Sequence, residues 1–361
     1  MKKTSLNGLH HQLGAKMVEF GGFEMPVSYS SIKEEHQCVR EKLGVFDVSH
    51  MGEFFVSGPK ALKFLQYACS NDISKLVPGK AQYNYLPNQK GGVVDDLIVY
   101  QLEDDAYLLV VNASNIDKDW EWLTELNAEI KAEMINASED YSLLAVQGPK
   151  AIEAMQKLTL DDLSKLSFYG HCTTNFAGIE DVIVATTGYT GSGGVEIYCK
   201  NEFARQLWDT VIEAGEPHGI QPIGLAARDT LRLEMGYCLY GNEINDTTSP
   251  ISAGLGWVTR PQTNFINSNQ IDKEKTGGTL TRLVGFEMTE RGIPRTGHVI
   301  LSESNTTIGH VTSGTQSPSL NKGIGLGYLD ISFTDLNTPI YIQIRNKAVP
   351  AKVVKLPFYT P

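Results

Sequence analysis

The chain has 361 residues and a formal net charge of -11, from 31 Lys and Arg against 42 Asp and Glu. Hydrophobic residues make up 41% and charged residues 20%, which is ordinary for a soluble globular protein and excludes a disordered one. The acidic balance argues against nucleic acid as the main partner. This length predicts two or three domains.

The cysteines, the histidines and the N-terminus narrow the class of protein further. The five cysteines are scattered without a CxxC pair, which predicts reduced thiols and a cytoplasmic protein. The eight histidines show no metal-ligand spacing, so we expect no metal site. The polar N-terminus excludes an ordinary secretory signal, and no apolar run reaches the length of a membrane span.

Over the first two thirds of the chain, strand-like and helix-like stretches are mixed without a regular order. The strand-like stretches are residues 52–58, 96–102, 106–112, 142–148, 181–187 and 195–200, and the helix-like ones are 59–70, 115–130, 149–159 and 202–215. Because no strand–helix–strand repeat appears, the pattern predicts an α+β fold rather than a doubly wound parallel sheet.

The stretch "GGVVDDLIVY", residues 91–100, places two aspartates ahead of an apolar run. An acidic turn would explain the two glycines and Asp95 but not Asp96, since strands are depleted in Asp. If this is a strand, alternation puts Asp96 and Tyr100 on one face and Asp95 on the other. The two carboxylates therefore cannot form a catalytic pair, and Asp96 is suited to the wall of a polar pocket.

The glycine-rich stretch "TTGYTGSGGVEIY", residues 186–198, ends in a predicted strand. It lacks the Lys-Ser/Thr of a phosphate loop and no helix follows it, so a glycine-rich hairpin loop is the simpler interpretation. Glu196 lies just inside the strand, on the same face as Tyr198. This carboxylate could accept hydrogen bonds from a planar heterocycle with adjacent N–H donors, or it could sit at a solvated strand edge.

A helix is predicted over residues 222–236, with Pro222 near its start and Gly236 after its end. Asp229 can reach Arg232 three residues on, which leaves Arg228 without an obvious local partner. Arg228 could form a structural ion pair elsewhere or bind an anionic or carbonyl-bearing ligand.

The remainder of the chain is predicted to form a polar linker and a small all-β unit. Residues 267–278, "NSNQIDKEKTGG", are the best candidate linker. From about residue 282, short strands separated by Gly, Pro, Ser and Asn turns predict a small barrel or sandwich. Earlier in the chain several tyrosines stand near glycines or polar turns, and singly each suggests ordinary packing more than a binding wall.

Seven segments together resemble one family across nearly the whole chain. In order they are "GGFEMPVSY", "GVFDVSHMG", "GGVVDDLIVY", "LLAVQGPKA", "TGYTGSGGVEIY", "GLAARDTLRLEMGYCLYGNEI" and "GHVTSGTQSPSLNKGIGLGY". The chain is thereby similar to the T-proteins, the aminomethyltransferases of the glycine cleavage system. The resemblance implies three domains in a cloverleaf around a central folate channel: residues 1–275 as two interleaved α+β domains and residues 280–361 as a β barrel.

The resemblance also implies a reaction and its partners. Members of the family take an aminomethyl group from the lipoylated H-protein, release ammonia and give 5,10-methylenetetrahydrofolate. Tetrahydrofolate is thus expected as a co-substrate, without metal, pyridoxal phosphate or flavin, and with neither nucleic acid nor membrane as a partner. We expect Asp96 to act at the reactive end of the folate, both stabilising the positive charge that develops as ammonia leaves and accepting a proton.

The resemblance assigns the remaining folate-site residues by position. Glu196 matches the carboxylate that holds the pterin, and Asn112 matches another position in the pocket. The remaining matches are Tyr83, Tyr100, Tyr169, Tyr189 and Arg228. The segment "TNFINSNQI", residues 263–271, departs from the Phe-Ile-Gly pattern of the family.

Three alternatives remain open on the sequence alone. A folate-binding relative concerned with iron–sulfur clusters would have Lys and Gln where this chain has Met235 and Asn242. The folate domain of a sarcosine or dimethylglycine dehydrogenase would follow a flavin domain for which this chain has no room. A protein that only binds a partner and has no enzymatic activity would not need the Asp96 and Glu196 carboxylates at these positions in the strands.

Overall fold

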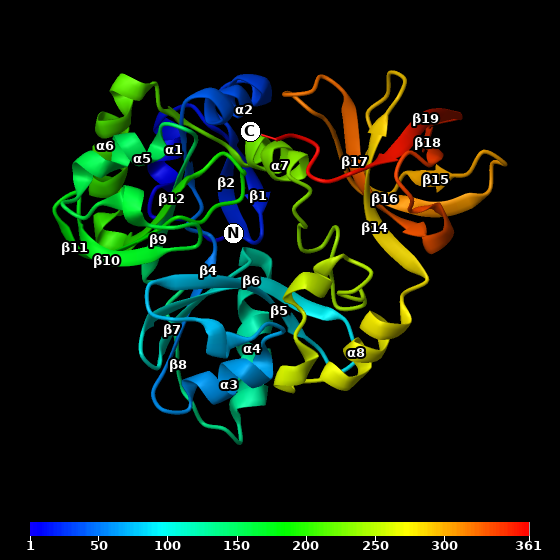
Figure 1. Cartoon of the computed structure of the whole chain (residues 1–361). Helices are drawn as coiled ribbons and strands as arrows, with labels where there is room; N and C mark the ends of the chain where they lie inside the picture. The colour runs from blue at the N-terminus through cyan, green and yellow to red at the C-terminus, as the bar shows by residue number, and fades with distance from the viewer. Residues whose placement is uncertain (361) are drawn as a thin grey trace. The chain divides into compact units, whose positions relative to one another are not determined.

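The computed structural model describes residues 1–360, which divide into two compact units (Figure 1). Unit 1 comprises residues 1–85 and 96–228. Unit 2 comprises residues 86–95 and the chain from residue 229 onward. The fold is α+β with a C-terminal barrel, as the sequence predicts. None of the helices formed by residues 1–360 is long and apolar enough to cross a membrane.

A six-stranded sheet in unit 1 has the order β10-β11-β12-β9-β3-β13. Strand β12 lies inside this sheet, so the solvated-edge interpretation of Glu196 is wrong. Its odd-numbered residues pack into an apolar core with α6, and alternation turns Glu196 and Tyr198 to the opposite face. The strands are β3 (Gly44–Asp47), β9 (Tyr141–Gln147), β10 (His171–Phe176), β11 (Ile179–Ala185), β12 (Gly194–Lys200) and β13 (Gln221–Pro222).

A second sheet has the order β5-β6-β7-β4-β8. Its long strand β6 includes both aspartates of the "GGVVDDLIVY" stretch, so this stretch is a strand and not an acidic turn. Residues 86–95, at the end of the β5–β6 hairpin, group with unit 2. The strands are β4 (Gly52–Ser57), β5 (Lys80–Pro87), β6 (Val93–Glu103), β7 (Ala106–Val111) and β8 (Glu133–Asn136).

The remaining elements of unit 1 are a hairpin and several amphipathic helices. The hairpin is β1 (Lys16–Phe20) with β2 (Phe23–Ser28). Helix α2 begins with a capping box, in which Ser31 and Glu34 satisfy each other's backbone N–H groups. The helices are α1 (Asn7–Gln12), α2 (Ile32–Glu41), α3 (Ala61–Ala68), α4 (Ile116–Asn127), α5 (Ala151–Met155) and α6 (Ala204–Gly215).

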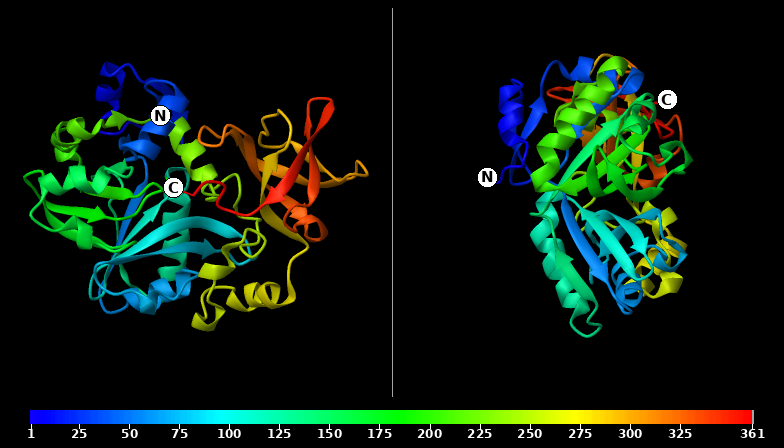
Figure 2. Two further views of the ribbon diagram at one scale, coloured as in Figure 1. Left: turned by 45° about the horizontal axis from the view of Figure 1, so that its top comes forward. Right: turned by 90° about the vertical axis from the view of Figure 1, so that its left-hand side faces the viewer.

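Unit 2 contains a closed antiparallel barrel of the order β14-β17-β16-β15-β18-β19. Its strands, orange to red in Figures 1 and 2, surround an apolar core that includes Phe286, Ile300 and Ile342. All six strands fall where the Gly- and Pro-punctuated pattern predicts them. Their bounds are β14 (Thr281–Met288), β15 (Val299–Leu301), β16 (Thr307–Gln316), β17 (Gly323–Asp330), β18 (Pro339–Ile344) and β19 (Lys347–Val354).

Two expectations about elements are wrong. Helix α7 spans Leu225–Glu234, and Pro222 precedes it in β13, paired parallel with β3. Parallel pairing with β3 holds this segment extended, since Pro222 is opposite Val45 and the Ile223 N–H donates to the Val45 carbonyl at 2.9 Å. The expected linker is mostly helix α8 (Ser268–Gly277), whose Ile271 is fully buried. Tertiary packing of Ile271 supports a helix in a stretch that is otherwise polar and has glycine only at its end.

Candidate functional site

Asp96 is held by two side-chain donors from neighbouring strands. The Tyr83 hydroxyl of β5 donates to Oδ2 at 2.7 Å, and the Asn112 amide, just after β7, donates to Oδ1 at 2.8 Å. Asn112 also donates to the Asp96 carbonyl at 3.1 Å. Hydrogen bonds to a carboxylate stabilise its ionised form and fix its orientation. The structure thus brings together three residues that the sequence analysis placed in one site.

Asn88 and Gly92 shape the turn ahead of Asp96. The Asn88 side chain accepts hydrogen bonds from the backbone N–H groups of Lys90 and Gly92, at 2.8 and 2.9 Å. A Cβ on Gly92 would come within 1.8 Å of the Asp246 carbonyl oxygen, so only glycine fits there. Asp95 is fully buried inside β6. The turn fixes where β6 begins and so which face Asp96 occupies.

Glu196 belongs to a second cluster, built from hydroxyl groups. Thr187 donates a short hydrogen bond to Glu196 Oε2, and the Tyr100 hydroxyl lies 3.4 Å from the same oxygen. Both bonds end on Oε2, so Oε1 is not used by them. Tyr100 is also 3.0 Å from Thr187 Oγ1 and 3.0 Å from the Tyr198 hydroxyl. Burial raises the pKa of Glu196, while Thr187 and the charge of Arg228 act to lower it.

The glycine-rich loop that precedes β12 is a rigid hairpin and not a phosphate loop. Gly188 has a φ of +155°, and a Cβ there would come within 2.0 Å of the Gln147 side chain. That Gln147 amide donates to the Thr187 carbonyl at 3.1 Å and accepts from the Thr190 hydroxyl at 2.9 Å. This packing sets the position of Thr187, and therefore of the hydroxyl that binds Glu196.

Tyr169 and Tyr189 complete the aromatic part of the site. Tyr169 has a φ of +58°, which is unusual for an aromatic residue, and its carbonyl accepts from the Ala81 N–H at 2.8 Å. Tyr169 also lies close enough to Tyr100 that its negative phenolate would raise the pKa of Tyr100. The Arg228 guanidinium lies over the Tyr189 ring, 4.6 Å from its centroid.

The two arginines of α7 have different surroundings. Arg228 is half-buried, stacks on Tyr189 and lowers the pKa of Glu196. Arg232 is 1% exposed and forms the predicted pair with Asp229, at 2.7 Å, and a second pair with the buried Glu243, at 2.9 Å. Arg232 thus forms a buried ion pair with Glu243. Arg228 supplies positive charge that acts to lower the pKa of Glu196.

The eight predicted residues all belong to unit 1, and strand β6 joins the Asp96 cluster to the Glu196 cluster, because Tyr100 shares a strand face with Asp96. From Asp96 to Tyr100 the strand advances about 13 Å, which separates the two carboxylate clusters. Only Tyr100 of the eight is fully buried. A long, flat, polar ligand with N–H donors at one end and a reacting centre at the other would match this arrangement.

The sequence analysis missed Thr187 and His50. Thr187 is the first donor to Glu196, and its only signal is its place between a strand and Gly188. His50 is 1% exposed, and burial together with the charge of Arg228 lowers its pKa to about 3. It therefore stays neutral and adds no charge to the site. Among residues 1–360 there is no cluster of three or more His, Cys, Asp or Glu side chains that could hold a metal ion.

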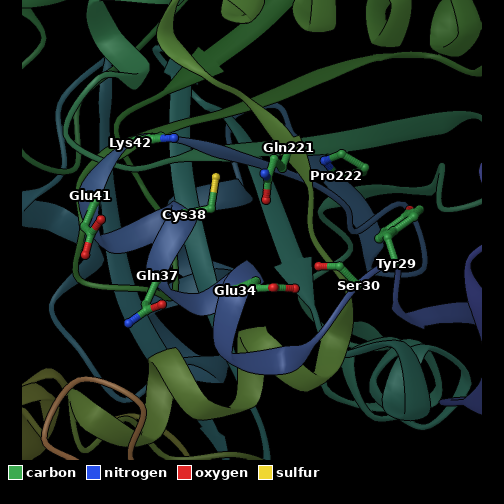
Figure 3. Close-up of a pocket in the computed structure, with 9 residues that line it drawn as sticks. All are labelled: Tyr29, Ser30, Glu34, Gln37, Cys38, Glu41, Lys42, Gln221 and Pro222. Atoms are coloured by element: carbon green, nitrogen blue, oxygen red, sulfur yellow. The ribbon is translucent and has the colours of Figure 1, made fainter.

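A hollow of about 560 Å³ lies beside α2 and β13, and none of the eight predicted residues lines it (Figure 3). Its charged lining comes from Glu34, Glu41 and Lys42. The lining also includes Tyr29, Ser30, Gln37, Cys38, Gln221 and Pro222.

Comparisons with known proteins agree with this geometry. Residues 6–263 match the family model described as the GCVT N-terminal domain, and residues 281–360 match the glycine cleavage T-protein C-terminal barrel domain. The chain belongs to the glycine cleavage T-protein family. It is 58% identical to an aminomethyltransferase of Flavobacterium psychrophilum over 359 residues and 54% identical to one of Bacteroides fragilis over 360, in each case covering 99% of both chains.

A solved structure of the T-protein family supports the fold. The crystal structure of the glycine cleavage system aminomethyltransferase T from Bartonella henselae matches with a TM-score of 0.93 at 33% identity, covering 99% of this chain and 98% of that one. The similarity therefore spans the whole chain and includes the barrel.

Proposed function

We propose that the site on unit 1 binds tetrahydrofolate and transfers to it the one-carbon unit of an aminomethyl group carried by the lipoylated H-protein. The chain is an aminomethyltransferase of the glycine cleavage system, on the evidence of relatives that are 50–58% identical over their full length. The observation that carries the residue assignment is that Asp96 and Glu196 stand in two separately built clusters of one site.

Glu196 is the residue we assign to the pterin. Adjacent N–H donors on a heterocycle can pair with a carboxylate in a bidentate manner, which requires a fixed and ionised group. Thr187 and Tyr100 fix the carboxylate, and Arg228 favours its ionised form. Tyr169 and Tyr189 supply flat aromatic surface beside it.

Asp96 is the residue we assign to the chemistry. The reaction needs no covalent protein nucleophile, because the carbon already carries an amine that can leave. The protein must hold two reactants together and stabilise the positive charge that develops as ammonia departs. With both oxygens held by Tyr83 and Asn112, the Asp96 carboxylate can do so without rearranging, and it can accept a proton from a folate nitrogen.

The proposed cellular setting follows from the cysteines. The five cysteines are free thiols in the structure, as expected of a protein in a reducing compartment. We accordingly propose that the enzyme is cytoplasmic. On the basis of its family we also propose that it works with tetrahydrofolate and the H-protein and needs no metal, pyridoxal phosphate or flavin. The iron–sulfur alternative is not favoured, since the full-length relatives carry the aminomethyltransferase name.

The proposal is tested by single-turnover ammonia release from aminomethylated H-protein, with and without tetrahydrofolate, for wild type and Asp96→Asn. We expect fast release only with tetrahydrofolate and only from wild type. Release that does not depend on tetrahydrofolate would contradict the folate assignment. A fully active Asp96→Asn enzyme would contradict the role of Asp96 alone.

A further inference from the structure

Glu53 is a buried carboxyl that the proposed reaction does not use. It lies in β4 and is 1% exposed. Its backbone is satisfied, since its N–H donates to Ser138 at 3.0 Å and its carbonyl accepts from Ala137 at 2.9 Å. Both side-chain oxygens, by contrast, lack a hydrogen-bond partner in the structure. A buried polar group in this state costs free energy, so its presence requires an explanation.

The register of the five-stranded sheet places Glu53 on the face that carries the site. Glu53 is opposite Val110 of β7, and Val110 is opposite Ile98 of β6. Directly opposed residues of an antiparallel sheet point to the same side, and so do residues two apart on one strand. The Glu53 side chain therefore shares a face with Asp96 and Tyr100.

Tyr100, on this face, is the middle member of a chain of hydroxyl groups that leads from Tyr198 to Glu196. Tyr198 and Tyr100 are 3.0 Å apart, and Tyr100 reaches both Thr187 and Glu196 Oε2. Burial raises the pKa of both phenols, so each keeps its single proton. Glu53 is near enough that its charge would raise the pKa of Tyr198 further.

The hydroxyl groups of Tyr100 and Tyr198 do not by themselves decide which of them donates and which accepts. If Tyr100 donates toward Glu196, its oxygen must accept from Tyr198, and the oxygen of Tyr198 is then left to accept from another donor. An ionised carboxylate cannot donate. Burial raises the pKa of Glu53 well above its ordinary value, which favours the neutral acid, the form that has a proton to donate.

We propose that Glu53, as a neutral carboxylic acid, binds one buried water molecule that bridges it to Tyr198, and thereby orients the hydroxyl chain that ends on Glu196. Such a water would accept a hydrogen bond from the Glu53 hydroxyl and donate one of its own to the Tyr198 oxygen, which supplies the donor that the chain of hydroxyl groups needs. Glu53 is thus a positioning residue for the ligand-binding carboxylate. The inference rests on the proposed function, in which Glu196 holds the pterin.

The other ionisable groups facing this chain are few. Strand β12 contributes Glu196 and Tyr198, β6 contributes Asp96 and Tyr100, and the loop before β10 contributes Tyr169. Strand β10 contributes His171, whose ring centroid lies 5.5 Å from that of Tyr100 and whose pKa is lowered by burial. Arg228 supplies the positive charge nearest to Glu196 that acts on its pKa. Ionising Glu53 would remove the donor at the far end of the chain and add a negative charge to a site that already holds Glu196.

Two substitutions separate this role from a structural one. Glu53→Gln keeps a donor in nearly the same shape, whereas Glu53→Met keeps the length and removes the donor. We expect the Gln variant to bind tetrahydrofolate as wild type does and the Met variant to bind it roughly three- to tenfold more weakly. Thermal unfolding should show Glu53→Met to be about as stable as wild type, because an apolar side chain of similar length offsets the lost hydrogen bonds by removing the cost of burying a polar group.

The pH dependence supplies a readout that a structural role would not change. Wild-type affinity should fall at alkaline pH as Glu53 loses its proton, and Glu53→Gln should lack this decline. Glu103→Gln, at the exposed end of β6, is the matched control and should behave as wild type. Wild-type affinity in Glu53→Met, or equal losses in Gln and Met, would overturn the inference. Failure of wild type itself to bind tetrahydrofolate would instead contradict the proposed function.

Discussion

At the residue scale, the site depends on carboxylates whose neighbours decide their charge and orientation. Asp96 takes two donors from β5 and from the end of β7, and Glu196 takes a threonine and a tyrosine hydroxyl. Neither arrangement is a catalytic pair, because the carboxylates lie on different strands in different clusters. Separate supports allow one carboxylate to bind and the other to react.

The titration of Glu196 should be visible in ligand binding. Burial raises its pKa, and the ionised form is the one that accepts N–H bonds. Affinity for tetrahydrofolate is therefore present above this raised pKa and is lost as the pH falls through it, at a higher pH than for an ordinary Glu near 4.3. Dissociation constants measured between about pH 4 and 8 should show this loss for wild type and not for Glu196→Gln. A flat wild-type profile would be incompatible with this role.

The two arginines of α7 should respond differently to substitution. Arg232→Met leaves Glu243 buried without its ion pair and should cost about 3–5 kcal/mol in unfolding free energy. Arg228→Met should cost much less stability but should weaken tetrahydrofolate binding roughly tenfold. Urea unfolding and ligand titration of both variants check this. If Arg228→Met costs more stability than Arg232→Met, the structural role assigned to Arg232 and the binding role assigned to Arg228 are wrong.

At the element scale, the sequence predicts strands and barrel well and helix boundaries less well. Alternation in β6 and β12 locates Asp96, Tyr100, Glu196 and Tyr198 on the correct faces, because a period of two leaves little freedom. The predicted helix start at Pro222 is wrong because tertiary pairing with β3 overrides local preference. The predicted linker before the barrel is wrong because the burial of Ile271 favours a helix there. Thr187 could not be found at all, because its role depends on a loop folded by Gln147.

The turn that begins β6 can be tested through its glycines. Gly92→Ala would push a methyl group against the Asp246 carbonyl, and we expect a loss of about 1–3 kcal/mol together with lower activity from a displaced Asp96. Gly8→Ala is the control, since open space surrounds its site in α1 and a gain of about 0.5–1 kcal/mol is expected. Thermal unfolding and turnover assays measure both. An unchanged Gly92→Ala enzyme would show that the turn does not fix the strand.

At the scale of the whole molecule, the chain combines a site-bearing unit with a barrel that has its own apolar core. The barrel core is drawn from residues between Val284 and Val353. The eight residues of the candidate site all belong to unit 1. Strand spacing predicts the barrel from about residue 282. It does not predict that residues 86–95 and the chain from residue 229 group with the barrel, since the expected boundary lies between residues 275 and 280.

A cavity in the barrel core should therefore destabilise the barrel and leave unit 1 largely unaffected. Phe286 is fully buried there, and Phe286→Ala should cost about 3–5 kcal/mol. Hydrogen exchange should accelerate in the barrel strands β14 to β19 and remain slow in β9 and β12 of unit 1. Equal acceleration in both sets of strands would show that the two units unfold as one.

The most direct test of the account compares Asp96→Asn with Glu196→Gln in the same two assays, tetrahydrofolate affinity and kcat at saturating tetrahydrofolate. We predict that Asp96→Asn lowers kcat by about 10²–10⁴-fold and leaves affinity within about threefold of wild type. Glu196→Gln should weaken affinity by about 10–100-fold while kcat falls much less. If both substitutions reduce the same quantity to the same degree, the division of labour between the two carboxylates is wrong.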